Sequence, residues 1–236
     1  MASLTGKVVL VTGGTGALGS VTSAAFAEAG ATVVASYIVD AEAEALRAMG
    51  GAGRYELAKV DLGSVEAVRT WVDDVRTRHG RIDVLLNLCG GFWGGVPVVE
   101  TPEEELDRML VMNLKTAFVC TRAVLPAMIE QRAGRIVNVT ARPALAGGAF
   151  VGAYAISKAG VAALTRAVAD EVREHGVTVN AIAPSTIDTP ANRAAMPDAE
   201  HASWVQPAEI ASTLLFLAGE GAGATSGAIV PVYGRA

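Results

Sequence analysis

A glycine-rich turn between a short apolar run and a helical pattern restricts the fold of this chain more than any other feature. The apolar run is Val8–Thr12, the turn reads TGGTGALG over residues 12–19, and the helical pattern is Ser20–Ala29. A second β-branched run, Thr32–Tyr37, completes a strand–helix–strand unit. Glycines let the backbone approach a pyrophosphate, whose charge is attracted by free N–H groups and the positive end of the helix dipole. The unit therefore predicts nucleotide binding, with a purely structural tight turn as the alternative.

Short strand-like runs alternate with longer helical patterns along the rest of the chain. The run Val8–Val11 is apolar at every position, which a strand requires when helices cover both faces of a parallel sheet. The pattern predicts an α/β fold with a doubly wound, Rossmann-like parallel sheet in three layers, of about seven strands. The expected strands are Val8–Thr12, Thr32–Tyr37, Glu56–Val60, Ile82–Leu86, Arg135–Thr140, Val177–Ile182 and Ala228–Val232.

The 236 residues contain no Pro/Ser-rich linker, charge block or internal repeat. A single dinucleotide-binding domain over residues 1–236 is therefore expected. Two long helices are expected over Pro102–Gln131 and Tyr154–His175. The irregular segment from about 184 to 207 is longer than an ordinary connection, which is typical of a binding loop or lid with short helices of its own.

Composition and charge exclude several classes of partner. The formal net charge is −5 and no Lys/Arg run occurs, so neither nucleic acid nor an anionic membrane is an expected partner. Cys89 and Cys120 cannot form a disulfide framework, and together with His79, His175 and His201 they have no metal-ligand spacing. We therefore expect no metal site and a reducing cytoplasm. The apolar run Val8–Val11 is too short for a signal-peptide core or a membrane span, so no targeting or anchoring segment is expected.

The segment Tyr154-Ala155-Ile156-Ser157-Lys158 carries the candidate chemistry. Tyr154 and Lys158 are four residues apart, so their side chains share one face of a helix. A nearby ammonium group is expected to lower the pKa of the phenol from ~10 toward neutrality, which makes the phenol a usable proton donor. An ordinary surface helix is the alternative reading of this spacing.

These motifs resemble those of the short-chain dehydrogenase/reductase family over nearly the whole chain. In the family's TGxxxGxG motif, Gly13 and Gly19 match, whereas Ala17 replaces the middle glycine and Gly16 lies one residue earlier. The sequence NLCG at residues 87–90 stands where the family has NNAG, and the sequence NAIAPS at 180–185 stands where it has a Pro-Gly pair.

The resemblance implies an NAD(P)H-dependent oxidoreductase that transfers hydride to a small C=O or C=N substrate. It implies Tyr154 as proton donor, Lys158 as a holder of the nicotinamide ribose, and Asn113 as a water-binding residue; a polar residue that kinks its helix is the alternative for Asn113. Asp61 would contact adenine, or cap a helix, or both. The implied cofactor-binding residues are Gly13, Thr15, Gly16, Ala17, Leu18, Gly19, Tyr37, Asp61, Leu62, Asn87, Gly90, Tyr154, Lys158, Pro184, Ile187 and Thr189.

The family's substrate-orienting serine is missing, because Ala141 occupies its position. Thr140 is adjacent, but strand alternation would point its side chain to the other face. Residues 88–95 and 188–199, with Trp204, resemble dihydropteridine reductase, a branch that lacks this serine. The expected substrate-side residues are Trp93, Ala141, Phe150, Met196 and Trp204, which suggest a flat or apolar small molecule.

Three further expectations concern the cofactor, Arg193 and the assembly. Tyr37 stands where an acidic residue would reject a 2′-phosphate, and no basic residue lies in Gly13–Gly19 or Tyr37–Asp40, so both cofactors should bind with a modest preference for NADP over NAD. Arg193 would bind an anionic substrate group or tether its loop. Apolar helix faces suggest a homotetramer or homodimer, through Ala117, Phe118, Leu125, Ala162, Leu164 and Ala169. A non-catalytic dinucleotide-binding regulatory protein is the alternative function.

Overall fold

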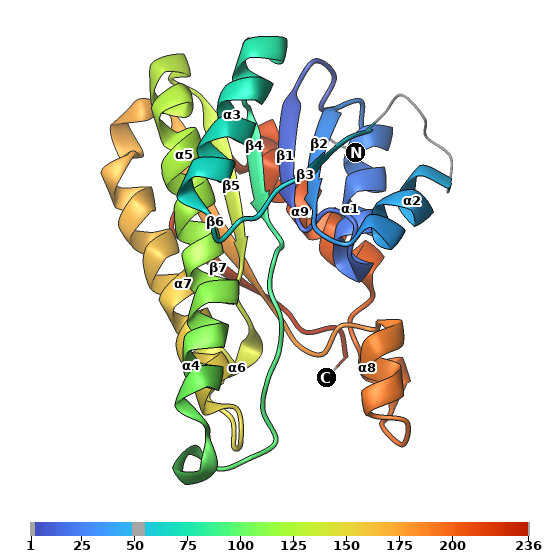
Figure 1. Ribbon diagram of the computed structural model, residues 1–236. Helices are drawn as coiled ribbons and strands as arrows, with labels where there is room; N and C mark the ends of the chain where they lie inside the picture. The colour runs from blue at the N-terminus through green and yellow to red at the C-terminus, as the bar shows by residue number, and fades with distance from the viewer. Residues whose placement is uncertain (1–2, 49–54, 236) are drawn as a thin grey trace.

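The computed structural model describes residues 3–48 and 55–235. Seven parallel strands form one sheet in the order β3-β2-β1-β4-β5-β6-β7 (Figure 1). The prediction of a doubly wound parallel α/β sheet is confirmed, and the strand ends lie within two residues of the predicted ones. The strands are β1 Val8–Thr12, β2 Thr32–Tyr37, β3 Tyr55–Lys59, β4 Val84–Asn87, β5 Gly134–Val139, β6 Val177–Pro184 and β7 Ile229–Val232.

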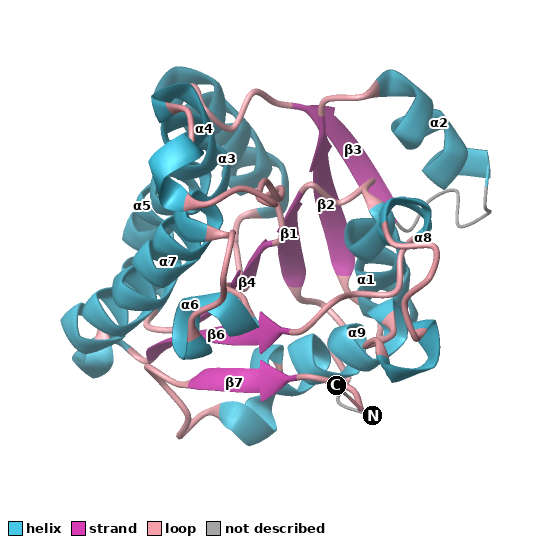
Figure 2. Ribbon diagram, turned by 90° about the horizontal axis from the view of Figure 1, so that it is seen from below, coloured by secondary structure: helices cyan, strands magenta, loops and turns pink. Residues whose placement is uncertain are grey.

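Helices cover both faces of this sheet (Figures 1 and 2). Helices α3, α5 and α7 pack on one face, whereas α1 and α9 pack on the other. Their bounds are α1 Ala17–Glu28, α2 Asp40–Ala48, α3 Val65–His79, α4 Glu103–Met109, α5 Thr116–Gln131, α6 Arg142–Ala146, α7 Gly152–Glu171, α8 Pro190–Ala195 and α9 Pro207–Ala218.

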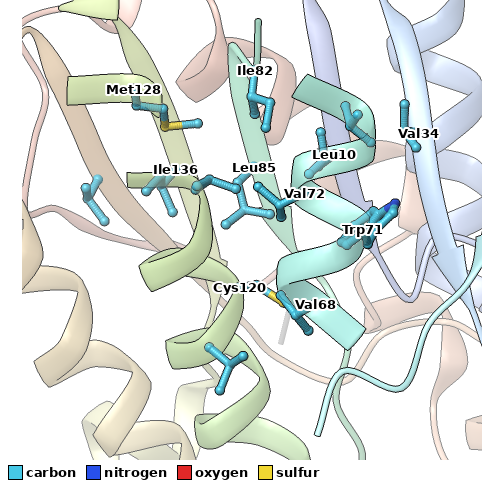
Figure 3. Close-up of a cluster of buried hydrophobic side chains, with 14 of the residues drawn as sticks. Leu10, Val34, Val68, Trp71, Val72, Ile82, Leu85, Cys120, Met128 and Ile136 are labelled. Carbon is cyan, nitrogen blue, oxygen red and sulfur yellow. The ribbon is translucent and has the colours of Figure 1, made fainter. Parts of the chain in front are cut away.

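The core has one layer on each side of the sheet. In the layer of Figure 3, Val68, Trp71 and Val72 of α3 face strand residues such as Leu10 and Leu85. All five residues of β1 are buried, as its continuous apolar run predicts. Each fully buried Val, Leu or Ile stabilises the fold by about 1.5–3 kcal/mol, so this core fixes the strands on which the candidate site depends.

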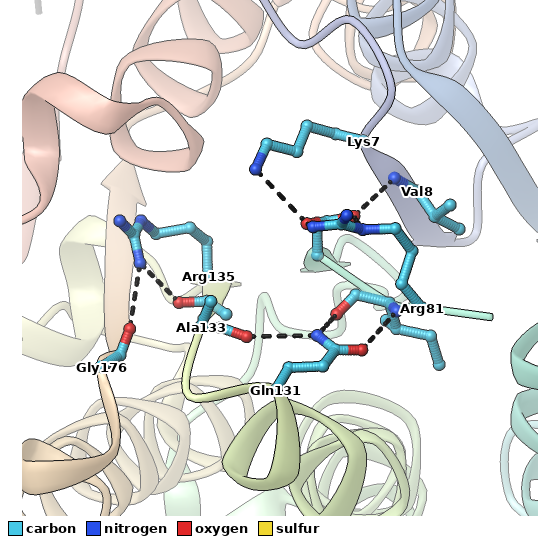
Figure 4. Close-up of polar contacts among 10 residues, drawn as sticks. Lys7, Val8, Arg81, Gln131, Ala133, Arg135 and Gly176 are labelled. Carbon is cyan, nitrogen blue, oxygen red and sulfur yellow. Dashed lines mark hydrogen bonds and ion pairs between the residues drawn. The ribbon is translucent and has the colours of Figure 1, made fainter. Parts of the chain in front are cut away.

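Polar contacts tie the amino ends of the strands together (Figure 4). The carboxylate of Asp83 accepts hydrogen bonds from the Val8 N–H at 2.9 Å and from Arg81 Nε at 2.7 Å. The side-chain amide of Gln131 donates to the Ile82 carbonyl at 2.8 Å and accepts from the Ile82 N–H at 3.0 Å. This edge is occupied by structural contacts, and the predicted reactive residues lie at the opposite edge.

The long helix expected over Pro102–Gln131 contains an irregular turn. Helices α4 and α5 are joined by a π-helical turn, Leu110–Lys115, in which the backbone is wound more widely. In the described part of the chain, Glu103–Gln131 is the one helical run long and apolar enough to cross a membrane, but 44% of its apolar window is buried. It is a core helix.

The expected intersubunit faces are only partly available. Ala117, Ala162 and Ala169 are 3–4% exposed because they pack inside this chain, so the prediction that they form a free surface is wrong. Phe118 remains 46% exposed on α5, and Ile156 is 56% exposed on α7. Helical periodicity identifies an apolar face but does not say which neighbour covers it.

Candidate active site

The candidate site lies at the carboxyl ends of the strands, where the strand order reverses between β1 and β4. In doubly wound sheets this reversal leaves a crevice for ligands, because the connections on either side run in opposite directions. The glycine loop follows β1, residues 88–95 follow β4, and Ala141 follows β5. Tyr154 and Lys158 come from α7, which packs beside β5 and β6.

The glycine loop forms a backbone cradle with no space for side chains at two positions. A Cβ at Gly19 would lie 2.0 Å from the Gly13 carbonyl oxygen, and one at Gly14 would lie 2.5 Å from the Ala35 Cβ. Gly13 has φ +62°, which favours glycine. Gly16 caps α1 and Ala17 is its first residue, so the substitution at the family's middle glycine stands at an open helix start. This cradle fits a dinucleotide pyrophosphate.

Thr12 joins the glycine loop to the segment after β4. Its hydroxyl oxygen accepts hydrogen bonds from the N–H groups of Leu88 and Cys89, both at 3.0 Å. The Gly13 N–H donates to Ser36 Oγ at 3.3 Å, which ties the loop to β2 as well. Neither Thr12 nor Ser36 was among the predicted site residues, although each ends or nearly ends a strand that leads into the site.

The end of β2 and the residues after β3 form the side of the crevice expected to hold adenosine. The Arg47 guanidinium lies 5.9 Å from the centre of the Tyr37 ring. Asp61 is exposed and accepts from the Gly63 N–H at 2.9 Å, whereas Ser64 caps α3, so the helix-cap alternative for Asp61 is not observed. The Leu62 side chain is buried in the core.

Asn113 links the π-helical turn to the segment after β4. Its side-chain oxygen accepts from the Gly91 N–H at 2.9 Å, while its amide donates to the Gly91 carbonyl at 3.1 Å and to Ser157 Oγ at 3.0 Å. A Cβ at Gly90 would lie 2.6 Å from the Asn113 oxygen and 3.2 Å from Lys158 Nζ. The π-helical turn agrees with the reading of Asn113 as a polar residue that distorts its helix, whereas water binding by Asn113 stays a prediction.

The side chain of Asn87, in contrast, makes hydrogen bonds to β5 and α5 beneath the site. Its amide donates to Asn138 Oδ1 at 2.8 Å and to Thr121 Oγ1 at 3.2 Å, and the residue is 4% exposed. Its side chain therefore fixes the neighbouring strands β4 and β5 at their carboxyl ends. A contact between Asn87 and the cofactor stays a prediction.

Lys158 is a buried ammonium group. It is 5% exposed, donates to the Val139 carbonyl at 2.8 Å, and forms no ion pair with any described residue. Burial without a carboxylate partner lowers the pKa of Lys158 to about 8. An ammonium carries three N–H donors, so two remain for a ligand. A buried, incompletely satisfied donor beside Gly90 fits the ribose-binding role that the family implies.

The phenol of Tyr154 behaves differently from the sequence-based expectation. Burial raises the pKa of Tyr154 to about 12, because the charged phenolate loses water. The expected lowering by Lys158 is wrong for the protein alone: Lys158 Nζ points to the Val139 carbonyl. Tyr154 is therefore a protonated phenol throughout the neutral range, which is the state that a proton donor needs.

Phe92 completes the reactive end. Its ring meets the Tyr154 ring edge to face, with 5.0 Å between centres and 69° between planes, and it is 62% exposed. Trp93, the neighbouring residue expected on the substrate side, is half-buried. Phe150 is 57% exposed at φ +64°, and its carbonyl accepts from the Gly95 N–H at 2.7 Å. The aromatic contact with Tyr154 could not be read from spacing alone.

At the position of the missing serine, the structure has a buried alanine, and the adjacent threonine hydroxyl is already hydrogen bonded. Ala141 is 4% exposed and precedes α6. The Thr140 hydroxyl donates to the Lys158 carbonyl at 2.6 Å, so it does not replace the serine as a donor. This agrees with the expectation that strand alternation turns Thr140 away.

The segment 184–207 contains the expected short helix, α8. Pro184 ends β6, Ile187 pairs with Val205, and Thr189 caps α8 by accepting from the Asn192 N–H at 3.2 Å. Met196 is 40% exposed. Trp204 is 6% exposed against His201, with 4.5 Å between ring centres, which is the environment of a packing residue.

Arg193 tethers this segment. Its guanidinium donates to both carboxylate oxygens of Asp188, at 2.5 and 2.7 Å, and the Gln206 amide donates to the same carboxylate at 2.8 Å. These bonds hold the pKa of Asp188 well below its usual range. Of the two roles left open by the sequence, the loop tether is the one observed.

Comparison with known proteins agrees with this geometry. A model of the short chain dehydrogenase family matches residues 7–200. The chain is 34% identical over 241 residues to the 3-oxoacyl-[acyl-carrier-protein] reductase of Thermotoga maritima, with 98% of each chain covered. It is 37% identical over 242 residues to the (2S)-[(R)-hydroxy(phenyl)methyl]succinyl-CoA dehydrogenase subunit BbsD of Thauera aromatica, with 97% of this chain and 95% of that one covered.

A solved structure of NAD+-bound xylitol dehydrogenase superposes with a TM-score of 0.90 at 28% identity, and the match covers 98% of this chain and 99% of that one. These relatives give no support to the resemblance to dihydropteridine reductase. They agree with the fold and with an oxidoreductase activity. The chain therefore belongs to the short-chain dehydrogenase/reductase family and is an NAD(P)-dependent oxidoreductase.

Proposed function

We propose that this protein, acting as a single domain, reduces a small C=O or C=N substrate with an apolar body and uses Tyr154 as the proton donor. The observation that carries the proposal is the phenol of Tyr154, which is kept protonated by burial and stands edge to face with Phe92. Lys158 comes from the same helix face one turn later. A proton donor, an apolar wall and a ribose-binding ammonium thus lie at one end of the crevice.

The residues present suit a nicotinamide dinucleotide. The loop Gly13–Gly19 would hold its pyrophosphate, and Lys158 would hold the ribose next to the nicotinamide through the two N–H donors that Val139 leaves free. The bound dinucleotide supplies or accepts the hydride. Asn113 holds the Gly91 backbone in place next to this end through two hydrogen bonds.

Tyr154 delivers the proton that balances hydride addition. As the substrate oxygen or nitrogen gains negative charge, the phenol O–H donates its proton to it, and the phenolate that remains is reprotonated before the next turnover. Such positioned proton transfer contributes typically ~10²–10⁴ in rate. Phe92 shields one edge of the phenol from water and offers its exposed ring to an apolar substrate group.

A panel of substrates tests the proposal. With NADH and NADPH, we expect turnover of small ketones, quinones or 3-oxoacyl thioesters, with a quinonoid dihydropterin as the C=N member. The regulatory alternative predicts dinucleotide binding without turnover of any member. Turnover that disappears in Tyr154→Phe separates the two functions.

The substitution Ala141→Ser probes the missing donor. If the natural substrate does not need an extra hydrogen bond to its developing anion, the variant should change its kcat less than about threefold and should improve poor ketone substrates by about tenfold or more. Steady-state kinetics of the wild type and of Ala141→Ser on the substrate panel measure these changes in kcat. A large rise in kcat for the natural substrate as well would contradict this, because it would show that the substrate needs the hydrogen-bond donor that Ala141 lacks.

We further propose that copies of the chain associate as a homodimer or homotetramer. Phe118 on α5 is about half-exposed next to Arg122, whose guanidinium lies 5.9 Å from the ring centre, and Ile156 is exposed on α7. We expect Phe118→Glu to reduce the assembly to monomers, since a carboxylate on this face opposes burial. Light scattering measures the mass. A wild-type monomer at micromolar concentration would refute the proposal.

The cellular location and the choice of cofactor complete the proposed function. We propose a reducing cytoplasm, in which the two free cysteines, Cys89 and Cys120, stay reduced. A modest preference for NADP(H) follows from Tyr37 alone. That expectation considered only residues close to Tyr37 in sequence, whereas the fold brings a further charge to the glycine loop.

A further inference from the structure

A carboxylate from α2 contacts the glycine loop. The Thr15 hydroxyl donates to Glu42 Oε2 at 2.9 Å, across 27 residues of sequence. Thr15 is 7% exposed within the loop, whereas Glu42 is exposed in the first turn of α2. The loop thus holds one carboxylate oxygen in place, and the other is not hydrogen bonded to any described residue.

This contact lies on the adenosine side of the crevice. The loop is tied to the end of β2 by the Gly13 and Gly14 N–H groups, which donate to Ser36. Tyr37 follows Ser36 directly, and α2 begins three residues later at Asp40. The Glu42 carboxylate therefore stands between the phosphate cradle and the end of β2, where the adenosine ribose of a dinucleotide must pass.

The two basic side chains near the end of β2 contact other residues. Lys59 Nζ pairs with Asp40 at 2.6 Å, and the Arg47 guanidinium lies over the Tyr37 ring at 5.9 Å. Glu42 forms no ion pair with the described residues, so its charge is not neutralised locally. An unneutralised carboxylate attracts hydroxyl donors and repels phosphate.

We infer that Glu42 is the residue that determines cofactor specificity, by accepting a hydrogen bond from the adenosine ribose of NAD(H) and repelling the 2′-phosphate of NADP(H). From α2, Glu42 supplies the carboxylate that is missing at the end of β2, where Tyr37 stands instead of an acidic residue. The inference rests on the proposed dinucleotide site and reverses the preference expected from Tyr37 alone. NADH should bind at least about tenfold more tightly than NADPH, since about 1.4 kcal/mol of charge repulsion is sufficient for such a difference.

Glu42→Gln tests this assignment because it removes the charge and keeps an oxygen for Thr15. Titration of both cofactors should show the NADH/NADPH preference falling by about tenfold, mainly because NADPH binds more tightly. Adenosine 2′,5′-bisphosphate should gain affinity in the same variant, whereas 5′-ADP should gain none. Glu44→Gln is the matched control: Glu44 is exposed on the same helix and has no hydrogen bond to a described residue.

The outcomes separate the two proposals. Wild-type preference for NADPH, or equal shifts in the Glu42 and Glu44 variants, would overturn the role of Glu42 while leaving dinucleotide binding intact. A loss of NADPH affinity in Arg47→Ala would assign the 2′-phosphate to Arg47 and would also overturn it. Failure of the wild-type protein to bind either cofactor would overturn the proposed function and this inference together.

Discussion

Tyr154→Phe should lower kcat for substrate reduction by about 10²–10⁴-fold while leaving the affinity for the dinucleotide within about twofold of the wild-type value. The variant loses the phenol O–H and keeps the ring, so the edge-to-face contact with Phe92 persists and the site keeps its shape. Steady-state turnover and cofactor titration on the same preparation measure both effects.

A second tyrosine provides the control for this experiment. Tyr55 lies on the edge strand β3, away from α7, and Tyr55→Phe removes the same hydroxyl group. We expect it to turn over substrate at the wild-type rate. Near-full turnover in Tyr154→Phe would mean that the proton comes from water or from another side chain, and the assignment of the reactive end would then be wrong even though the fold is right.

Lys158→Met should make the protein more stable and nearly inactive. Folding buries the Lys158 ammonium without a carboxylate, which lowers the pKa from 10.5 to about 8. This shift corresponds to about 3 kcal/mol of destabilisation at pH 7. Methionine fills similar space without a charge but leaves the Val139 carbonyl without its donor, so a net gain of about 1–2 kcal/mol is expected. We expect kcat/KM to fall by about 10²-fold or more.

The free energy of unfolding of the wild type should depend on pH in a defined direction. Because the folded-state pKa of Lys158 is the lower one, the unfolded chain binds more protons between pH 8 and 10.5. Stability of the wild type therefore rises with pH across that window, and the full destabilisation is present below it. The advantage of Lys158→Met should shrink from pH 7 to pH 10, as measured by denaturant unfolding.

Lys115→Met is the matched control for Lys158→Met, since Lys115 is exposed at the start of α5. It should change neither stability nor its pH dependence by more than about 0.5 kcal/mol. A Lys158→Met protein that is destabilised equally at both pH values would show that the ammonium is well satisfied in the free protein.

The fold could be predicted from local patterns because each layer leaves its own signature in the chain. Continuous apolar runs such as Val8–Val11 mark strands buried on both faces, and the glycine turn fixes the first crossover. The Tyr–Lys spacing on α7 likewise placed the two reactive side chains on one helix face. These features depend on neighbours in sequence, which is why reading the sequence found them.

Features that depend on approach between distant segments were not predictable in this way. The contact of Phe92 with Tyr154 joins residues that follow different strands. The contact of Glu42 with Thr15 depends on how α2 returns over the glycine loop. The direction of the Tyr154 pKa shift depends on where Lys158 Nζ points, which spacing along a helix does not specify.

The π-helical turn Leu110–Lys115 has a consequence for how the long helix can evolve. A wide turn takes up one extra residue, and each residue of a regular helix advances by about 100°, so α4 and α5 follow two azimuthal frames that differ by about that angle. Each frame can accept substitutions that suit its own surroundings: α7 for α4, and α3 and the sheet for α5. Asn113 lies within this turn, where its side chain accepts the hydrogen bond from the Gly91 N–H.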